Sequence, residues 1–530
     1  MLTILFAFSL IYKYLKKFCR LHETLEIEIF LSFSLFLRID INLLFMYNTS
    51  IRGDIVKSKL SGFLENSLPK VKQLVKDLEK KFSYVSILGV DTIGMAYSVR
   101  RTGSSVSDSN WSDRGFVARI FNGHNYSEYS FNQLDHLDDI KQQIIKVVTK
   151  DIEIYKKSNI KFMAFPLIDE NELKQEYYTD FEIDPFSIST KQKLEDLQKL
   201  VDIGLKKSKF FVDFRAILEE VSISKIFVSS KKELKQAILY TNSVLVCIGR
   251  KNEQIKYDFA GLSGLKGYEI VSETEGKIDQ VANSVLELFE AERIIPGDYE
   301  VICDPAISGL IAHEAFGHGV EMDMFVKNRA KGAEYINKEI ASDKVVMRDG
   351  ALSADEVGTY LFDDEGTLGT DTLIIEKEIL KSGISDLLSA LKLNTVPTGN
   401  GRRQGFERKV YARMTNTFFE TGNDELEDMI GSIKKGYLLI GYTSGMEDPK
   451  NWGIQCAITK GREIIDGKFT GKVVSPIMMT GYVPDMLKSI SMVSKDHFEL
   501  SGGGACGKGY KEFVKVSTGG SYIKAIARLS

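Results

Sequence analysis

The stretch DPAISGLIAHEAFGHGV, from Asp304 to Val320, decides how the C-terminal half of the chain is organised. Asp304 can cap the N-terminus of a helix, and Pro305 suits the first helical position. The next seven residues, AISGLIA, are mostly apolar, so we expect the helix to be buried. The stretch therefore predicts a buried helix that carries His313 and His318 near its end.

The two histidines flank Glu314 with a spacing that modifies a known zinc-protease motif. In His-Glu-x-x-His the histidines are four residues apart on one helix face, and both rings reach one metal ion. Here they are five residues apart, which separates them by roughly 140° around an α-helix. A single π-type turn would bring both back to one face, and Gly317 is a suitable place for it. We therefore predict a hydrolytic metal site; two hydrogen-bonded histidines on a buried helix are the alternative.

The composition of the whole chain is typical of a soluble globular protein with two domains. With 530 residues, the chain is longer than a protein with one ordinary hydrophobic core. Of its residues, 43% are hydrophobic and 27% are charged. The formal net charge of −4 does not indicate a nucleic-acid footprint, so we expect no nucleic-acid partner. The five cysteines are scattered without paired spacing. This usage favours a reducing, cytoplasmic compartment over a disulfide framework.

Residues 1–45 differ from the rest of the chain because they are rich in Leu, Ile and Phe. Their uncharged runs, 1–12 and 29–37, are shorter than the ~20 residues that a membrane span needs. Lysines follow the first run, whereas a secretory signal carries its positive charges before the apolar run. We expect residues 1–45 to be an untranslated upstream extension, with the working protein starting at Met46 and no membrane partner. A membrane-associating hairpin is the alternative.

Hydrophobic periodicity predicts an N-terminal domain over 46–295 and a C-terminal domain over 296–530. Helices are expected at 61–81, 136–157, 189–207 and 278–293, and strands at 84–88, 95–100, 116–121, 126–131, 211–217, 223–229 and 243–248. Pro69 is expected to break the first helix. The predicted fold class is α+β, with an N-terminal α/β-meander domain and a largely β C-terminal domain that carries the metal-binding helix.

A catalytic zinc usually has three protein ligands and keeps one position for water, so a third ligand is required. Glu321 and Asp323 are acidic candidates that follow His318 directly. Cys506 is a distant candidate in the glycine-rich run SGGGACGK (501–508), where glycines would let the backbone approach a metal closely. A lone cysteine is more often a small buried hydrophobic residue. The residues alone therefore leave the third ligand open.

The same run matches the first seven positions of a phosphate-binding loop, from Gly502 to Lys508. Gly509 stands where such a loop has the Ser or Thr that holds magnesium. The following residues, YKEFVKV, favour a strand over a helix, and only 21 residues follow Gly509. We therefore expect no nucleotide site here.

Five segments in order resemble the TldD/PmbA family, and specifically its metal-binding TldD members. They are HEAFGHGVE (313–321), DDEGTLGTDTLIIEKEIL (363–380), GNGRRQGF (399–406), RMTNTFFE (413–420) and GGGACGKG (502–509). PmbA-type members lack the histidine pair. The resemblance implies a zinc-dependent peptidase in which His313, His318 and Cys506 bind Zn²⁺. The catalytic carboxylate residue of the family corresponds to Glu314.

The resemblance also implies a substrate and a partner. Family members cleave unfolded or extended peptides, including leader segments of modified peptides, with little side-chain preference. They form dimers that enclose a cavity, often TldD with PmbA, so a homodimer or a heterodimer with a PmbA-like chain is expected. The hydrophobic extension before Met46 departs from the family pattern.

In the expected reaction Glu314 takes a proton from a metal-activated water and later passes it to the leaving amine. Arg413 and Asn416 are candidates for orienting the substrate backbone, and a hydrogen-bonded turn is the alternative role for both. A second hypothesis is a non-catalytic, peptide-binding partner subunit with a structural zinc. Such a site would be closed by four protein ligands.

Overall fold

The computed structural model describes residues 55–158, 162–510 and 512–530. Val56–Ser530 form one compact unit. The predicted extension over residues 1–45 lies outside the described residues. Within the described part, no helix is long and apolar enough to cross a membrane.

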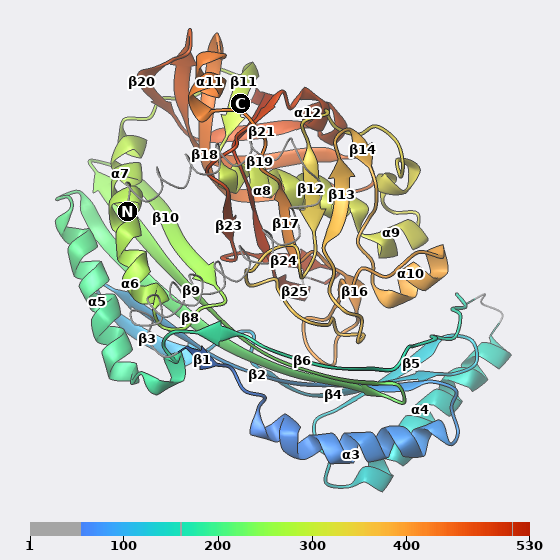
Figure 1. Ribbon diagram of the computed structural model, residues 1–530. Helices are drawn as coiled ribbons and strands as arrows, with labels where there is room; N and C mark the ends of the chain where they lie inside the picture. The colour runs from blue at the N-terminus through green and yellow to red at the C-terminus, as the bar shows by residue number, and fades with distance from the viewer. Residues whose placement is uncertain (1–54, 159–161, 511) are drawn as a thin grey trace, which may run out of the picture. The chain divides into compact units, whose positions relative to one another are not determined.

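The N-terminal part is built on an eight-stranded sheet with the main order β10-β9-β8-β2-β4-β5. The strands on this path are antiparallel, β3 pairs with β2, and β6 runs parallel to β9. Its strands are β2 (Val85–Arg100), β3 (Gly103–Asp108), β4 (Asp113–Phe121), β5 (Tyr126–Phe131), β6 (Leu173–Tyr178), β8 (Phe211–Ser229), β9 (Lys232–Lys251) and β10 (Gln254–Gly264). Figure 1 shows this sheet as a long curved layer. A small separate pair joins β1 (Val56–Lys57) and β7 (Asp180–Phe181).

Helices cover one face of this sheet in two separate groups (Figure 1). The first group is α3 (Gly62–Glu79) and α4 (Leu137–Lys157); the second is α5 (Thr190–Lys206), α6 (Ile270–Thr274) and α7 (Ile278–Phe289). Each group buries its own hydrophobic cluster against the sheet. The predicted helices are therefore confirmed to within a few residues, and Pro69 lies inside α3 instead of breaking it. Packing of apolar residues on both sides of Pro69 holds the helix continuous.

Long strands replace several short ones that the sequence predicted. The expected strands 84–88 and 95–100 are one strand, β2, and the expected strands 211–217 and 223–229 are also one, β8. β2 contributes apolar residues to both helix-covered clusters, and its middle carries the buried polar residues Asp91 and Thr92. The polar middle resembles a turn in the sequence, but both of its residues pair with β8 and β4 in unbroken register.

Two sheets form the C-terminal part. The seven-stranded sheet has the order β11-β18-β19-β21-β27-β22, with β20 paired to β19, and the six-stranded sheet has the order β14-β13-β12-β17-β26-β23. The strands of the first are β11 (Gly297–Cys303), β18 (Lys435–Asp448), β19 (Gly453–Ile465), β20 (Lys468–Val474), β21 (Ile477–Tyr482), β22 (Met492–Val493) and β27 (Ile523–Leu529). Those of the second are β12 (Val346–Asp349), β13 (Thr372–Glu376), β14 (Ile379–Leu380), β17 (Asn416–Phe419), β23 (Glu499–Ser501) and β26 (Ser517–Gly520).

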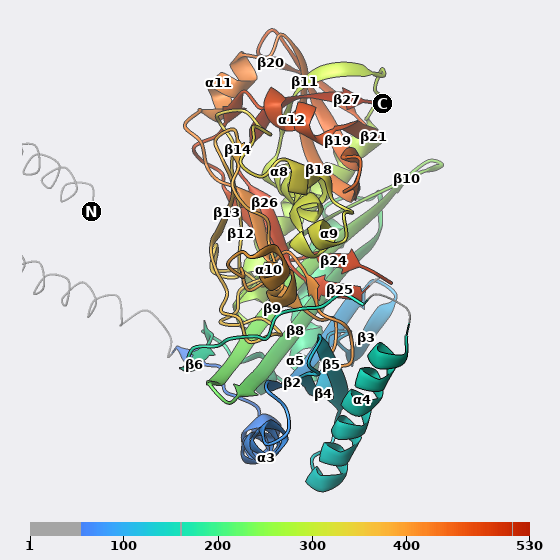
Figure 2. The ribbon, with the colours of Figure 1, turned by 90° about the vertical axis from the view of Figure 1, so that its right-hand side faces the viewer.

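The helix α8 (Pro305–Leu310) packs against both C-terminal sheets, because it contacts β18 in one and β17 and β26 in the other. Figure 2 shows it among these strands, with the hairpin of β24 (Ala505–Lys508) and β25 (Glu512–Lys515) nearer the N-terminal sheet. The remaining elements are α9 (Met322–Val326), α10 (Leu387–Leu393), α11 (Leu426–Gly431), α12 (Val483–Ser489), β15 (Gly401–Arg402), β16 (Tyr411–Ala412), β24 (Ala505–Lys508) and β25 (Glu512–Lys515).

The segment around Asp364 docks the C-terminal part on the face of the N-terminal sheet that the helices leave free. Lys225 on β8 forms an ion pair with Asp364 at 2.5 Å, and Arg119 on β4 pairs with Glu365. Phe362 is fully buried against apolar residues of the N-terminal sheet.

The helices and sheets of the two parts together confirm the predicted α+β fold class. The boundary at residue 296 stays a prediction, because the two parts share one compact unit.

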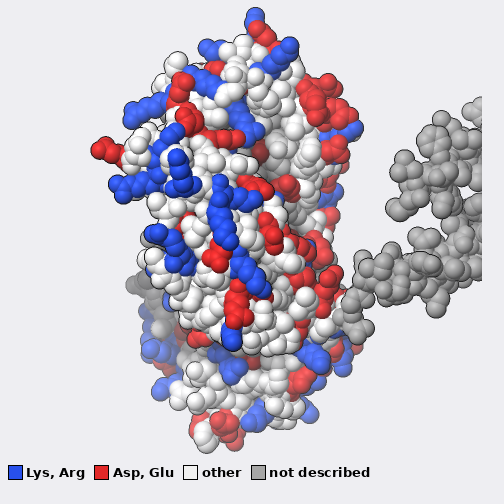
Figure 3. All heavy atoms as spheres, turned by 90° about the vertical axis from the view of Figure 1, so that its left-hand side faces the viewer, with Lys and Arg blue, Asp and Glu red and all other residues white. Residues whose placement is uncertain are grey.

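Surface charge is mixed on the face that α5, α7 and β20 form. Figure 3 shows Lys and Arg side chains interleaved with Asp and Glu side chains there. Ion pairs such as Lys207–Asp279 at 2.6 Å and Lys472–Glu292 at 2.8 Å account for part of this pattern. Exposed pairs of this kind contribute little to stability.

Candidate metal centre

The helix of the histidine motif changes from α to π geometry at the motif. Asp304 caps α8 as predicted, since its Oδ1 accepts a hydrogen bond from Ile307 N at 2.9 Å. A π turn then covers Ile311–Gly317, and His318 N donates to the carbonyl oxygen of His313. The predicted π distortion is therefore present, and it ends at the predicted glycine.

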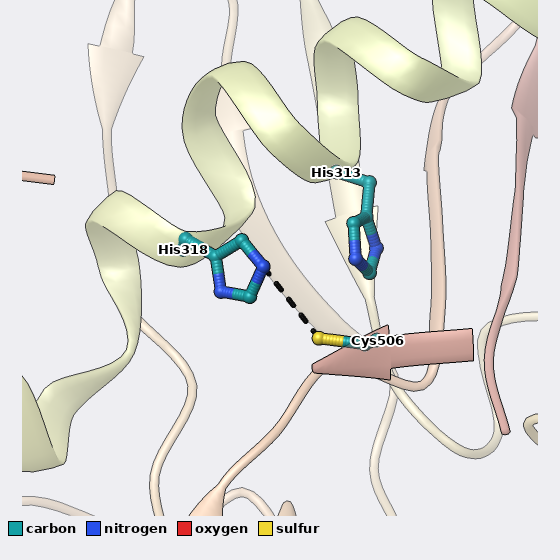
Figure 4. Close-up of side chains that lie close together, drawn as sticks. All are labelled: His313, His318 and Cys506. Atoms are coloured by element: carbon teal, nitrogen blue, oxygen red, sulfur yellow. Dashed lines mark hydrogen bonds between the residues drawn. The ribbon is translucent and has the colours of Figure 1, made fainter. Parts of the chain in front are cut away.

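This geometry brings His313 and His318 together with Cys506, which is 188 residues beyond His318. One ligand atom of each residue lies within 4.8 Å of the others. Cys506 Sγ lies 3.5 Å from His318 Nε2, and the two imidazole ring centroids are 5.3 Å apart. Figure 4 shows both rings extending from the π turn toward the thiol on β24. In the described part of the chain, no fourth His, Cys, Asp or Glu joins this cluster.

The donor set fits a metal ion. His313 Nδ1 is buried and has no hydrogen-bond partner among the described residues, which is unfavourable unless a ligand engages it. Burial would raise the pKa of the Cys506 thiol, but His318 and His313 lower this pKa well below its usual range. The thiolate is the metal-binding form. Two imidazoles and one thiolate are ligands that Zn²⁺ prefers, and three protein ligands leave one position open.

Glu321 binds the far side of His318 and is not a member of the cluster. Its Oε2 lies 3.2 Å from His318 Nδ1, so the other ring nitrogen, Nε2, is the one that faces Cys506. Burial would lower the pKa of His318, but Cys506 and Glu321 raise it well above its ordinary value. Asp323 is also outside the cluster, and it pairs with Lys327 at 2.8 Å. Of the three candidates for a third ligand, the structure places only Cys506 with both histidines.

Glu314 lies beside the cluster on the same π turn. Its Oε2 is 4.0 Å from His318 Nε2, and its side chain is 26% exposed. A Cβ atom on Gly445 of β18 would lie 2.9 Å from Glu314 Cγ, so this strand passes the glutamate closely only because it has glycine there. The carboxylate is therefore held next to the cluster while it stays accessible to solvent.

Arg413 and Asn416, the candidates for substrate contact, are buried and bound to other parts of the protein. Arg413 donates to the carbonyl oxygens of Cys506 and Glu512, which lie on the two strands of the β24–β25 hairpin. Asn416 Oδ1 accepts from Ser517 Oγ at 2.5 Å, and its amide donates to two backbone oxygens and a threonine hydroxyl. These contacts favour the alternative role, in which both residues support the site structurally.

The loop that precedes Cys506 is tied to the N-terminal sheet. Gly502 N donates a hydrogen bond to Ser263 Oγ on β10 at 2.6 Å. A Cβ atom on Gly502 would lie 2.3 Å from a methyl group of Val357, so this position has no room for a side chain. The N-terminal sheet therefore helps to place the strand that carries the thiol.

Glu447 on β18 is a residue of the site that sequence reasoning missed. Both of its carboxylate oxygens are buried without a hydrogen-bond partner in the described part. Burial, opposed by His318, raises the pKa of Glu447 to about 9. A Cβ atom on Gly319 would lie 3.0 Å from Glu447 Oε1, which places this carboxyl beside the end of the histidine helix. Glu447 follows His318 by more than a hundred residues, and no spacing in the sequence links the two.

The fold and the cluster together define an α+β protein with a candidate His/His/Cys metal centre. Residues 296–524 match the family of PmbA/TldA metallopeptidase C-terminal domains. Over 299 residues the chain is 31% identical to a metalloprotease of Methanocaldococcus jannaschii. This matched segment covers 56% of this chain and 64% of that protein. Over 229 residues the chain is 33% identical to the zinc metalloprotease TldD homolog of Saccharolobus solfataricus. This matched segment covers 43% of this chain and 50% of that protein.

Solved structures share the fold as well. TldE from Thermococcus kodakarensis superimposes with a TM-score of 0.67 at 19% identity, and the match covers 87% of this chain and 100% of that chain. The C-terminal part of the chain is therefore similar to the PmbA/TldA metallopeptidase family, and the likeness to TldE shows the fold. The chain spans 64% of the Methanocaldococcus relative and 50% of the Metalloprotease TldD homolog of Buchnera aphidicola from Acyrthosiphon pisum.

Proposed function

We propose that this chain is a zinc-dependent peptidase that hydrolyses unfolded or extended peptides. The observation that carries the proposal is the cluster of His313, His318 and Cys506 with Glu314 beside it. Relatives that are named metalloproteases, one of them a zinc metalloprotease, support the same activity. The resemblance to the family supports a cytoplasmic dimer, either of two copies or with a PmbA-like chain.

Five residues of the site have a defined part in the proposed reaction. His313, His318 and Cys506 would hold the zinc ion, which supplies a Lewis acid and lowers the pKa of water. Glu314 takes the proton from the attacking water and passes it to the leaving amine. Glu321 holds the His318 ring through Nδ1, so that Nε2 stays directed toward the cluster.

The hairpin that carries Cys506 suits an extended peptide. Within the described residues, β24 and β25 pair with no other strand, so an added strand could lie along either edge wherever Arg402 and Arg413 do not already bind the carbonyl oxygens. An added strand binds through backbone hydrogen bonds, which place few demands on side chains. This mode of binding agrees with the weak sequence preference that the family resemblance implies.

The second candidate function, a peptide-binding subunit with a structural zinc, is less well supported. A structural zinc site is closed by four protein ligands. The described part of the chain offers three His and Cys ligands within reach of one another, and Glu314 is partly exposed beside them. An open position next to a carboxylate favours hydrolysis.

The variant Glu314→Gln tests the proposal. We expect about one zinc per chain by elemental mass spectrometry, as in the wild type, and hydrolysis of an unstructured peptide slowed at least about 100-fold. Glu153→Gln, an exposed change on α4, is the matched control and should keep full activity. Full activity in Glu314→Gln would remove this residue from the base role. A wild-type chain without zinc, prepared without chelators, would instead favour the peptide-binding subunit.

A further inference from the structure

Lys508 lies at the centre of a chain of charged groups behind His318. Its Nζ is 2.9 Å from Glu321 Oε2 and 2.7 Å from Asp323 Oδ1, and it donates to the carbonyl oxygen of Ala412 at 3.0 Å. Glu321 Oε2 is the same atom that lies 3.2 Å from His318 Nδ1. The ammonium group and the imidazole therefore share a single carboxylate oxygen.

Glu321 depends on this shared oxygen, because its other oxygen is isolated. Oε1 of Glu321 is buried and has no hydrogen-bond partner among the described residues. The Glu321 side chain is only 2% exposed, and that of Lys508 is 10% exposed. A buried carboxylate is costly unless it is paired and hydrogen-bonded. The Lys508 ammonium group, at 2.9 Å, is an ion-pair partner that fixes the position of this carboxylate.

The same strand presents Lys508 and the thiol. Cys506 and Lys508 are two residues apart on β24, so their side chains extend from the same face of the strand. One strand thus supplies a candidate metal ligand and, through Glu321, the orientation of another. This lysine completes the apparent phosphate-loop match in the sequence, and its contacts give it a different role.

We propose that Lys508 is a positioning residue of the metal centre: it fixes Glu321, which holds His318 with Nε2 directed at the Cys506 thiol. Carboxylates that bind the second nitrogen of a metal-ligating histidine set its tautomer and ring orientation. Lys508 acts one step further out, by holding that carboxylate in place through the ion pair at 2.9 Å. The proposal rests on the proposed zinc-dependent function.

Binding of Co²⁺ to the full chain tests this role without relying on catalysis. The readouts are Co²⁺ affinity, by competition with a chelator, and the thiolate-to-cobalt absorption band. We expect Lys508→Met to weaken Co²⁺ binding roughly 10- to 100-fold, in line with other outer-shell changes, and to alter the band. Lys327→Met is the matched control, because Lys327 pairs with Asp323 at 2.8 Å and forms no ion pair with Glu321 among the described residues. It should bind Co²⁺ as the wild type does.

A double variant separates positioning from general stability. In a Glu321→Gln background a neutral amide replaces the carboxylate that Lys508 pairs with. Adding Lys508→Met there should therefore weaken Co²⁺ binding by less than about three-fold further. This pair also removes both charges together, which is less disruptive than leaving one buried charge alone. If the losses of Co²⁺ affinity caused by Lys508→Met and Glu321→Gln simply add in the double variant, the role of Lys508 is overturned. Wild-type Co²⁺ affinity in Lys508→Met would overturn it as well.

The outcomes also distinguish this inference from the proposed function. A wild-type chain that binds Co²⁺ through its thiolate but hydrolyses no peptide would refute the peptidase and leave the role of Lys508 standing. Hydrolysis together with an unchanged Lys508→Met affinity would refute the positioning role alone. A wild-type chain that binds neither Co²⁺ nor Zn²⁺ would refute both.

Discussion

The sulfur atom of Met414 occupies the space beside Gly317, so that a Cβ atom on Gly317 would lie 2.1 Å from Met414 Sδ. The backbone of Gly317 has φ −57°, which any residue can adopt. The glycine is therefore required by close packing and not by backbone conformation. Met414 is fully buried, so it has little freedom to move away.

Gly317→Ala should consequently disturb the end of the π turn. We expect the free energy of unfolding to fall by about 1–3 kcal/mol, as for other overpacked interiors, and the zinc content to decrease because His318 follows directly. Chemical denaturation and elemental mass spectrometry measure the two effects. Gly431→Ala is the control, since a Cβ atom there meets nothing within 4 Å, and its stability should change by less than about 0.5 kcal/mol. Unchanged zinc content in Gly317→Ala would contradict the importance of this packing.

Cys506→Ala should remove most of the bound zinc, because two imidazoles alone form an incomplete ligand set. Zinc per chain after dialysis is the measurement. Cys247→Ala provides the comparison, since Cys247 is a buried free thiol on β9 in the N-terminal hydrophobic cluster. That variant should lose some stability and keep its zinc. Equal zinc content in the two variants would exclude Cys506 as a ligand.

Glu128→Gln should change the acid stability of the protein. Burial would raise the pKa of Glu128, but Arg119 and Arg403 lower it to about 2. A carboxylate with a lowered pKa stabilises the folded state fully above its ordinary pKa of about 4.3, and this stabilisation is lost as the pH falls toward 2.

The stability difference between the wild type and Glu128→Gln should therefore reach up to about 3 kcal/mol near neutral pH. It should shrink steadily below about pH 4. Urea denaturation at several pH values checks this, with Glu153→Gln as an exposed control. A difference that stays constant down to about pH 3 would argue against the two ion pairs as its cause.

Asp304→Ala should destabilise the start of the histidine helix. Besides capping α8 through Oδ1, Asp304 accepts a hydrogen bond from Gly441 N at 2.8 Å through Oδ2. Loss of an N-cap costs about 0.5–2 kcal/mol, and a buried amide left without its acceptor adds to that cost. Asp304→Asn keeps one acceptor oxygen and should cost less. Thermal unfolding of both variants would rank them, and the reverse order would contradict the double contact.

The local geometry of the site could be predicted from the sequence, whereas its long-range contacts could not. The five-residue spacing of His313 and His318 predicts the π turn because only that geometry puts both rings on one face. The glycine-rich run makes Cys506 one of several candidate ligands, but nothing in the residues links it to the histidines across 188 positions, and only the family resemblance selects it. The position of Glu321 just after His318 makes it a candidate ligand in the sequence, but this short separation lets it bind the outer ring nitrogen instead.

The fold shows the same limit. Helix positions could be predicted, because each helix has one continuous apolar stripe. The lengths of β2 and β8 could not, since a strand that serves two hydrophobic clusters has a polar middle that resembles a turn. In the sequence Lys508 resembles the lysine of a nucleotide loop, whereas in the structure it pairs with Glu321 and Asp323.

The hydrogen bond from Gly502 to Ser263 has a consequence for how this gene can evolve. The histidines and the cysteine are encoded in one half of the chain, yet the loop before the cysteine is anchored by the other half. A recombination or gene-splitting event near the codon for Pro296 would keep every candidate ligand in one reading frame and still remove a support of the thiol. A C-terminal half produced alone would therefore contain every candidate ligand but lack this anchor for the loop before Cys506.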